Sequence, residues 1–441
     1  MQWLERRFHL EQNGTTLRRE ILGGVTTFLT MAYIIFVQPL VLGAAGMDVG
    51  AVMTATCLAS AFACVIMALL ANYPIALAPG MGTNVFFAYT VVLTMGFTWQ
   101  QALGAVFFSG MLFLLLTFVG VREAIIQAIP ANLRSAIAVG IGFLISVVGL
   151  EWAGIVADHP ATLVTLGDLA APPSLLALLG LTVTAACLAL GWRAAILIGI
   201  GVTLLVGILA GLVPFAGVVG GAPSLAPTWL QLDFSALLTP ELLPVVFVFF
   251  FLDLFDTVGT LTGVTQEAGL MRPDGTLPRA RQALTADALG TVIGSLLGTS
   301  TVTSYVESAA GIATGARTGL ANLVTAALFL GALFFSPLLK AVGGGVSWGD
   351  TTLYPVIAPA LIVVGCLLAS SIRRIEWQTP DEAIPAFLTI LMMPLTFSIT
   401  EGLAFGFISY TALKLVQGRV REVPPLISIC AVLFLLRYVF L

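Results

Sequence analysis

Long runs of apolar residues follow one another along almost the whole chain, and short polar turns separate them. Fourteen of these runs approach the roughly 20 residues that an α-helix needs to cross a membrane. They lie near residues 21–43, 51–72, 78–95, 99–120, 132–150, 173–190, 194–213, 242–265, 284–298, 303–316, 318–339, 353–371, 382–399 and 402–417. The pattern predicts an all-α polytopic membrane protein with 14 transmembrane segments.

A polar loop rich in Pro and Gly, residues 213–240, divides the predicted spans into two sets of seven. Because each set contains an odd number of spans, the two halves enter the membrane in opposite orientations. This is the arrangement of an inverted repeat, which is common in secondary transporters. We therefore predict a 7+7 inverted repeat.

Arginines near the span ends indicate the orientation. If the N-terminus is cytoplasmic, each of them follows an even-numbered span and lies in the cytoplasm, as the positive-inside rule requires. These residues are Arg122, Arg134, Arg193, Arg272, Arg279, Arg281, Arg317, Arg373, Arg374, Arg419 and Arg421. We expect a multi-pass protein of the plasma membrane, the inner membrane in a bacterium, with residues 1–20 as a cytoplasmic head.

A last apolar stretch, residues 424–441, follows the fourteenth predicted span and belongs to a C-terminal segment that begins at residue 419. It is long enough to cross the membrane as a fifteenth span. It could also lie along the interface, with Arg437 extending its charge into water. We favour the interfacial helix.

Composition excludes several other classes of protein. Only 9% of the 441 residues are charged and 59% are hydrophobic, whereas about 25% of the residues in a soluble domain are charged. A cytosolic enzyme, a disordered chain and a disulfide scaffold are therefore excluded, and the long unbroken runs exclude a transmembrane β-barrel. No basic tract predicts nucleic-acid binding. His9, His159 and the five cysteines form no metal-binding motif, so we expect no metal, no cofactor and no enzymatic activity.

Two predicted spans begin with sequences that form poor helices, and both are third in their half. The third span opens with residues 78–84, which include Pro79 and two glycines, and the tenth opens with the hydroxyl-rich residues 298–305. Irregular backbone at membrane depth is tolerated only where it is buried or lines a cavity. Two ordinary kinks would explain each break separately, but their matching positions favour a transport site. A short helix should follow each break and direct its N-terminal N–H groups at a ligand.

The eighth predicted span contains Asp253 and Asp256, which lie three residues apart and therefore share one helix face. Thr257 and Thr260 continue that face. A charged group inside a span is costly and is usually functional. The alternative is a pair of structural hydrogen bonds to neighbouring helices.

Two further polar residues follow the breaks, Asn84 in the third span and Glu307 in the tenth. In an inverted repeat these two spans meet the eighth near the middle of the membrane, so the carboxyl groups are expected to face one cavity. No predicted span carries an Arg or Lys at depth to neutralise them. Because burial favours the neutral form of a carboxyl group, these residues are candidates for proton coupling.

A site with carboxylates and no fixed cation repels anions, and it suits a cation or a neutral molecule with N–H donors. A carboxylate that accepts two adjacent N–H groups would recognise the edge of a heterocycle. Phe86, Phe87 and Tyr305 lie beside the breaks and are candidates for stacking on a flat ring. Thr303, in the second break, is a further candidate for substrate binding.

Four segments of the chain resemble the AzgA-like adenine/guanine/hypoxanthine permeases, a branch of the nucleobase:cation symporters (the nucleobase–ascorbate transporter family). The segments are residues 24–33, 78–89, 253–261 and 298–311. The resemblance covers nearly the whole chain, and the last two motifs are specific. We find no departure at the polar positions.

The resemblance implies a UraA-like fold with a core domain and a gate domain. The core domain would combine residues 21–120 and 241–340, and the gate domain would combine residues 121–240 and 341–418. The resemblance also implies proton symport of a purine base, with hypoxanthine, guanine and adenine as candidate substrates, and a homodimer formed through the gate domains.

The resemblance also implies roles for individual residues. By similarity, Asp256 and Glu307 hold the purine and Asn84 supports the site. Asp253 would assist proton coupling or hold the site together. The alternative function is an anion transporter of the same fold, of the sulfate or bicarbonate type, which the carboxylates oppose. A channel is disfavoured because paired breaks are typical of carriers.

Overall fold

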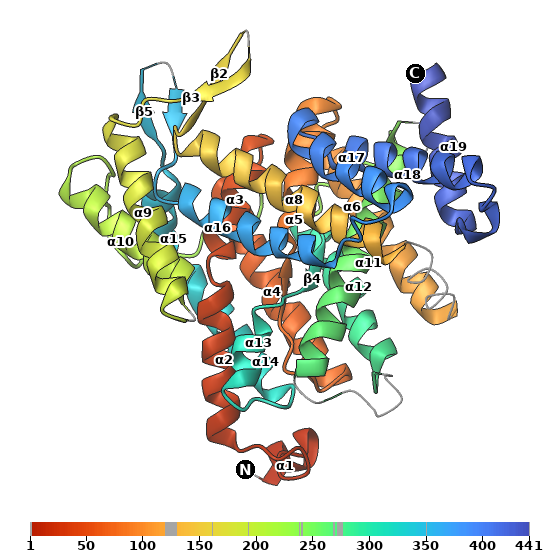
Figure 1. The fold of residues 1–441 in the computed structure, drawn as a ribbon. Coiled ribbons are helices and arrows are strands. Elements are labelled where there is room, and N and C mark those ends of the chain that lie inside the picture. The colour runs from red at the N-terminus through yellow and green to blue at the C-terminus, as the bar shows by residue number, and fades with distance from the viewer. Residues whose placement is uncertain are drawn as a thin grey trace.

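Helices dominate the computed structural model, which describes residues 2–119, 130–160, 162–192, 194–237, 239, 241–267, 270, 277–349 and 351–440 (Figure 1). Seven helical segments in these ranges are long and apolar enough to cross a membrane: Leu17–Ala44, Val49–Leu70, Trp99–Thr117, Ala131–Trp152, Pro172–Ala189, Leu320–Leu338 and Ile399–Val416. Shorter apolar helices cover Met81–Thr94, Ala195–Leu209, Leu242–Leu254 and Pro425–Leu436.

Every predicted span coincides with a helix or with a strand followed by a helix. The first half contains α1 (Gln2–Phe8), α2 (Leu17–Met31), α3 (Ile34–Ala44), α4 (Val49–Leu70), α5 (Met81–Val85), the π-helix η1 (Phe86–Thr94), α6 (Trp99–Val119), α8 (Ala131–Trp152), α9 (Pro172–Ala189) and α10 (Ala195–Leu209). The second half contains α11 (Leu242–Glu267), α12 (Ala280–Leu297), α13 (Ser308–Ala313), α14 (Leu320–Ala332), η2 (Leu333–Phe335), α15 (Ser336–Gly343), α16 (Ala358–Ala369), η3 (Ser370–Arg374), α17 (Pro380–Thr396), α18 (Ile399–Val416), η4 (Val420–Glu422) and α19 (Pro425–Phe440). The crossing of 14 of these elements as a 7+7 inverted repeat stays a prediction.

Three two-stranded antiparallel sheets interrupt the helices. They pair β1 (Leu77–Pro79) with β4 (Val302–Ser304), β2 (Val156–His159) with β3 (Leu163–Leu166), and β5 (Val346–Trp348) with β6 (Thr351–Leu353). The last two pairs are hairpins between consecutive strands. The first pair joins the two predicted breaks, which lie far apart in the sequence.

The first helix of the membrane region begins earlier than the sequence pattern suggested. Because α2 starts at Leu17, Glu20 lies in the first turn of this helix, and the assignment of residues 1–20 to a cytoplasmic head stays a prediction. The Glu20 carboxylate is buried and accepts hydrogen bonds from the backbone N–H groups of Arg317, Thr318 and Ala321, at 2.7, 3.3 and 3.2 Å. The residue therefore binds the start of α14 to α2. Three arginines used for the orientation lie outside the described residues: Arg122, Arg193 and Arg272.

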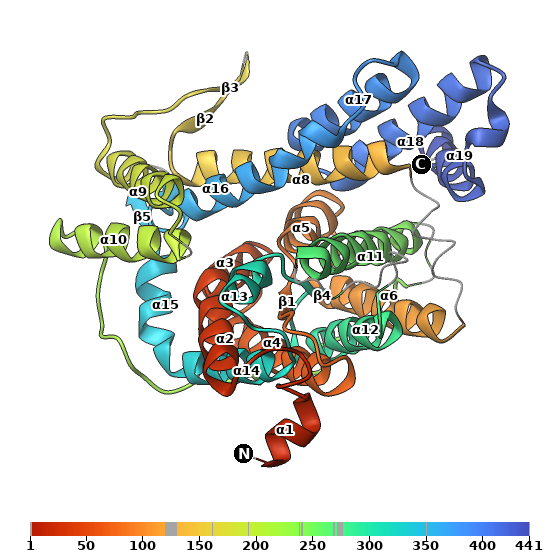
Figure 2. The ribbon, with the colours of Figure 1, turned by 60° about the horizontal axis from the view of Figure 1, so that its bottom comes forward.

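The helices form two groups, which are separated most clearly in Figure 2. In one group α8 packs against α16 and α17, and α9 packs against α10 and α16. In the other group α4 packs against α12 and α14, and α6 packs against α11 and α12. The two groups contain the helices that the resemblance assigns to the gate domain and to the core domain. Their action as two domains stays a prediction.

Small residues bring α8 and α16 into close contact. A Cβ atom built on Gly142 of α8 would lie 2.6 Å from the carbonyl oxygen of Gly365 on α16, and one built on Gly365 would lie 2.3 Å from the carbonyl oxygen of Gly142. Neither position has room for a side chain. Close backbone approach at small residues is typical of helix packing in membranes, where burial of apolar surface does not drive association.

α19 packs against the first half of α18. Phe434 contacts Phe407, with ring centroids 6.4 Å apart, and Tyr438 contacts Phe405 at 6.3 Å. The Tyr438 hydroxyl donates a hydrogen bond to the carboxylate of Glu401 in the first turn of α18. The end of α19 therefore lies beside the first half of α18, and the two helices run antiparallel. This packing favours a fifteenth span over the interfacial helix that we expected for residues 424–441.

A fifteenth span would place the C-terminus outside the cell, because α18 is expected to end in the cytoplasm. We expect green fluorescent protein to be dark when it is fused to the C-terminus of the full chain, and an alkaline phosphatase fusion at the same position to be active. A chain that ends at Gly418 serves as the control, and its fusions should show the opposite pattern. Fluorescence from the full-length fusion would support the interfacial helix instead.

Candidate functional site

The two broken spans meet as a pair of antiparallel strands. Residues 77–79 pair with residues 302–304, and the Gly80 N–H continues the pairing by donating to the carbonyl oxygen of Thr301 at 3.0 Å. The β-branched residues of the second break favour the extended backbone. Pairing provides each strand with hydrogen-bond partners that the surrounding apolar side chains cannot offer. The sequence indicated both breaks but not that they pair.

Each strand leads into a short helix, as the sequence predicted. α5 begins at Met81 and continues as the π-helix η1 to Thr94, whereas α13 begins at Ser308. A π-helix is rare and is often found at functional sites. Glu307 is the residue that precedes α13, and its side chain makes no capping hydrogen bond to the helix. Its carboxylate is therefore available for other contacts.

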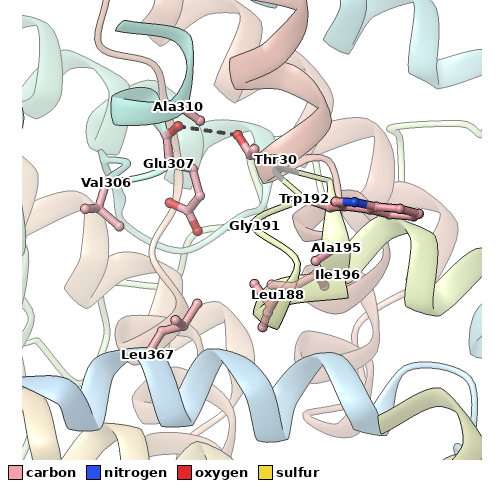
Figure 3. Close-up of a pocket in the computed structure, with 10 residues that line it drawn as sticks. All are labelled: Thr30, Leu188, Gly191, Trp192, Ala195, Ile196, Val306, Glu307, Ala310 and Leu367. Atoms are coloured by element: carbon pink, nitrogen blue, oxygen red, sulfur yellow. Dashed lines mark hydrogen bonds between the residues drawn. The ribbon is translucent and has the colours of Figure 1, made fainter. Parts of the chain in front are cut away.

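A cavity of about 350 Å³ lies between the two groups of helices (Figure 3). The lining residues come from α2, α13 and the residue pair before α13 on one side, and from α9, α10, the turn between them and α16 on the other. They are Thr30, Val306, Glu307, Ala310, Leu188, Gly191, Trp192, Ala195, Ile196 and Leu367. Glu307 is the one acidic residue among them, and its carboxylate points into the open space (Figure 3). Among the described lining residues, one carboxylate thus faces a mostly apolar wall.

Residues at and before the junction between α2 and α3 form hydrogen bonds with Glu307. The Tyr33 hydroxyl donates a hydrogen bond to Glu307 Oε1 at 2.6 Å. Thr30 lies one turn earlier on α2 and donates to the Glu307 carbonyl oxygen at 3.4 Å. These contacts fix the direction of the acidic side chain. An oriented carboxylate can accept N–H donors from a ligand in the cavity.

Asp256 lies near the middle of α11, and its side chain is nevertheless exposed. A Cβ atom built on Gly80 would lie 3.5 Å from Asp256 Oδ2 and 2.8 Å from the Thr303 methyl carbon. The missing side chain at Gly80 therefore makes room for the Thr303 methyl group, and the Asp256 carboxylate lies at ordinary contact distance from the same position beside the strand pair. Asp256 is close enough to Glu307 for their charges to interact, although it is not among the residues that line the cavity.

A buried network links the first break to the second through Asn84. The Ser300 hydroxyl donates to the Asn84 side-chain oxygen. The Gln38 amide on α3 donates to Ser300 at 3.2 Å and to Thr299 at 2.8 Å. All four side chains are fully buried. Asn84 thus holds the two breaks together and does not reach the cavity.

A second buried network surrounds the strand pair from α11 and α12. Thr291 donates to Asp253 Oδ2 at 3.0 Å, and its hydroxyl also contacts the Val302 backbone. On the same side, the Thr257 hydroxyl donates to Asp287 Oδ1 at 2.7 Å and lies 2.8 Å from the Thr303 hydroxyl. Asp253, Thr257 and Thr303 are buried. They support the strand pair, and Thr303 is not available to a ligand in this conformation.

The aromatic residues proposed for stacking are not free to stack. The Phe86 ring is fully buried and packs edge-on against Phe249, with ring centroids 4.8 Å apart. Tyr305 is buried, and its hydroxyl donates to the Pro79 carbonyl oxygen at 2.5 Å. Thr260 is half-buried one turn beyond Asp256 and does not line the cavity. The stacking hypothesis for Phe86 and Tyr305 therefore does not fit this conformation.

The sequence reading missed several residues of the site. Tyr33 and Gln38 are polar but uncharged side chains in the first apolar run, so they lacked the charge that identified Asp253 and Asp256. Trp192 carried no such signal, because it lies in a turn of the other group of helices. Its place at the cavity depends on how the two groups pack.

Sequence comparisons relate the chain to known permeases. The model of the Permease family (Xan_ur_permease) matches residues 18–405. The adenine permease AdeP of Escherichia coli strain K12 is 45% identical over 438 residues, which cover 99% of this chain and 96% of that protein. The guanine/hypoxanthine permease PbuG of Bacillus subtilis strain 168 is 47% identical over 446 residues, which cover 98% of this chain and 99% of that protein.

Structural comparisons relate the fold to membrane transporters of low sequence identity. The transmembrane domain of the cyanobacterial bicarbonate transporter BicA matches with a TM-score of 0.65 and 16% identity, over 88% of this chain and 97% of that one. The murine anion transporter Slc26a9 in its inward-facing state matches with a TM-score of 0.64 and 11% identity, over 91% of this chain and 69% of that one. At these identities the likeness concerns the fold alone.

Proposed function

Because the chain belongs to the Permease family, we propose that it is a secondary active transporter that imports purine nucleobases by proton symport. The candidate substrates are adenine, guanine and hypoxanthine. Their choice is supported by the adenine permease AdeP and the guanine/hypoxanthine permease PbuG, which align with nearly the entire chain.

The observation that carries the proposal is the Glu307 carboxylate, which faces a cavity between two groups of helices. A purine base is flat and neutral, and it carries N–H groups along its ring edges. A carboxylate held by Tyr33 can accept these N–H groups through charge-assisted hydrogen bonds. The apolar side chains on the opposite wall, Leu188, Ile196 and Leu367, suit the faces of such a ring.

The acidic groups at membrane depth provide the physical basis for proton coupling. A carboxylate that leaves water loses solvation, and taking up a proton removes this cost. We propose that Glu307 and Asp256 hold the base and that one carboxyl of the site gains the proton on loading. Asn84 and Asp253 support the strand pair behind them. No cofactor other than the proton enters this mechanism.

Transport would proceed by alternating access between a core domain and a gate domain. Spans 1–4 and 8–11, residues 21–120 and 241–340, would form the core of a 7+7 inverted repeat. The remaining spans, residues 121–240 and 341–418, would form the gate and the contact of a homodimer. With a cytoplasmic N-terminus, the lining residues at the ends of α9 and α16 lie near the cytoplasmic face, so the cavity would open inward.

An anion transporter of the same fold is the alternative. The bicarbonate transporter BicA supports the fold, but its 16% identity carries no information on the substrate. Among the described residues that line the cavity, Glu307 is the one acidic residue and none is Arg or Lys. A negative group repels an anion, so these residues give no support to the alternative.

A competition experiment tests the substrate class. We expect cells or proteoliposomes that contain the protein to accumulate labelled hypoxanthine, and unlabelled adenine or guanine to compete for uptake. Uracil and sulfate should not compete, because neither presents a purine edge to Glu307. A proton uncoupler should abolish accumulation but leave exchange of labelled for unlabelled base intact. Competition by sulfate or bicarbonate alone would overturn the proposal in favour of the alternative.

A further inference from the structure

On the side of the site opposite the cavity mouth, the two groups of helices touch each other directly. The Thr90 hydroxyl on η1 donates a hydrogen bond to the Phe397 carbonyl oxygen at 3.2 Å, across the boundary between the groups. Thr90 is 1% exposed. The rings of Tyr89 and Phe397 lie 6.4 Å apart at the same place. In the predicted orientation η1 and the turn between α17 and α18 lie toward the outside of the cell.

Phe397 has a backbone conformation that is unusual for its residue type. It forms the turn between α17 and α18 with φ 49° and ψ 32°, in the left-handed region. Glycine is the usual residue at such a helix end, because a Cβ atom makes this conformation unfavourable. Strained backbone of this kind is found where surrounding contacts enforce it, often at sites that switch. Here the contacts with Thr90 and Tyr89 are on the other group of helices.

A second contact lies between this boundary and the strand pair. A Cβ atom built on Gly82 of α5 would lie 3.0 Å from the Ile141 side chain on α8. Ile141 is 8% exposed. The route from the strand pair toward the outside therefore passes two contacts between the groups, at Gly82 and at Thr90. The route inward passes the open cavity at Glu307.

We propose that Thr90 and Phe397 form the outer gate of the transporter and hold it shut in the inward-facing state. The proposal rests on the proposed function, since a gate requires alternating access. When the outer side opens, the Thr90 hydroxyl and the Phe397 carbonyl separate and both bind water. The hydrogen bond therefore exists in one state only, and its loss shifts the balance between the two states. Thr90 acts by positioning the helices and does not contact substrate.

The test measures whether a buried position behind the gate becomes reachable from outside. Ile141→Cys is introduced into a protein whose five native cysteines are replaced by Ala, and intact cells are treated with a membrane-impermeant maleimide. Thr90→Val keeps the shape of the side chain and removes the hydroxyl. We expect it to raise the labelling rate about three- to tenfold, the effect of losing one neutral hydrogen bond that forms in a single state. If Val packs poorly at this position, Thr90→Ala should raise the labelling rate by a similar factor.

Two variants serve as matched controls. Thr90→Ser retains the hydroxyl and should label at the rate of the parent protein. Thr94→Val removes a hydroxyl from the same π-helix, where Thr94 is exposed and donates to the Tyr89 carbonyl oxygen at 2.7 Å, and it should also leave the rate unchanged. Equal labelling of the parent, Thr90→Val and Thr90→Ala would overturn the gate. Because labelling requires no substrate, failure of purine uptake in the parent would reject the proposed function separately.

Discussion

Replacing Glu307 by Gln is expected to reduce purine uptake about 100-fold, because a hydrogen bond to a charged group contributes roughly 1.5–3 kcal/mol. Glutamine has almost the same shape, and its side-chain oxygen can still accept the hydrogen bond from Tyr33. The change removes the negative charge that faces the cavity, and it replaces one acceptor oxygen by an N–H donor. That donor opposes the N–H groups of a purine. The measurement is the initial rate of labelled hypoxanthine uptake, normalised to the amount of protein in the membrane.

Glu241→Gln provides the matched control for this change. Glu241 is exposed in the turn before α11 and belongs neither to the cavity lining nor to the strand pair, so its replacement should leave uptake unchanged. A normal uptake rate for Glu307→Gln would contradict the assignment of Glu307 as the group that binds substrate. If the Glu307→Gln variant is missing from the membrane, the result would instead indicate that the carboxylate is needed for folding.

The breaks in the third and tenth spans could be predicted because local sequence determines them. Pro79 and its neighbouring glycines disfavour a helix on their own, as does the hydroxyl-rich run that ends at Tyr305. The pairing of these breaks could not be predicted in the same way. It joins residues 77–79 to residues 302–304 through backbone hydrogen bonds, which leave no pattern in either segment.

The structure was also needed to tell which acidic residues of α11 a ligand can reach. A spacing of three residues placed Asp253 and Asp256 on one face of α11, but at 3.6 residues per turn they still point about 60° apart. This difference is enough to bury Asp253 against Thr291 and to leave Asp256 exposed. Periodicity alone cannot separate a supporting carboxylate from one that a ligand can reach.

The side chains that form the apolar wall of the cavity could not be predicted from the sequence, for another reason. The sequence suggested Phe86 because it lies beside a break, and the structure buries that ring against Phe249. Leu188 and Trp192 line the cavity instead, and they belong to the opposite group of helices. Which side chains face Glu307 depends on how the two groups pack, and in an alternating-access carrier this packing would change during transport.

Replacing Asp256 by Asn is expected to reduce uptake strongly, by about tenfold or more, because it removes an exposed charge beside the strand pair. If this carboxyl takes part in proton coupling, uptake by the parent protein should fall as the external pH rises, since fewer protons are available to load the site. Asparagine stays neutral at every pH, so the residual uptake of the variant should depend less on pH. The measurement is the initial rate of uptake across external pH values, combined with exchange of labelled for unlabelled base without a proton gradient.

Exchange without a gradient separates the two roles of Asp256. A carboxyl that serves proton coupling alone is dispensable for exchange, so Asp256→Asn should then retain exchange and lose accumulation. A carboxyl that also holds the purine is needed for both, and we expect this result because Asp256 lies beside the strand pair and interacts with Glu307. Asp158→Asn, in the exposed β2–β3 hairpin, is the control and should change neither rate. Full accumulation by Asp256→Asn with an unchanged pH profile would exclude Asp256 from both roles and leave Glu307 as the carboxylate that binds the purine.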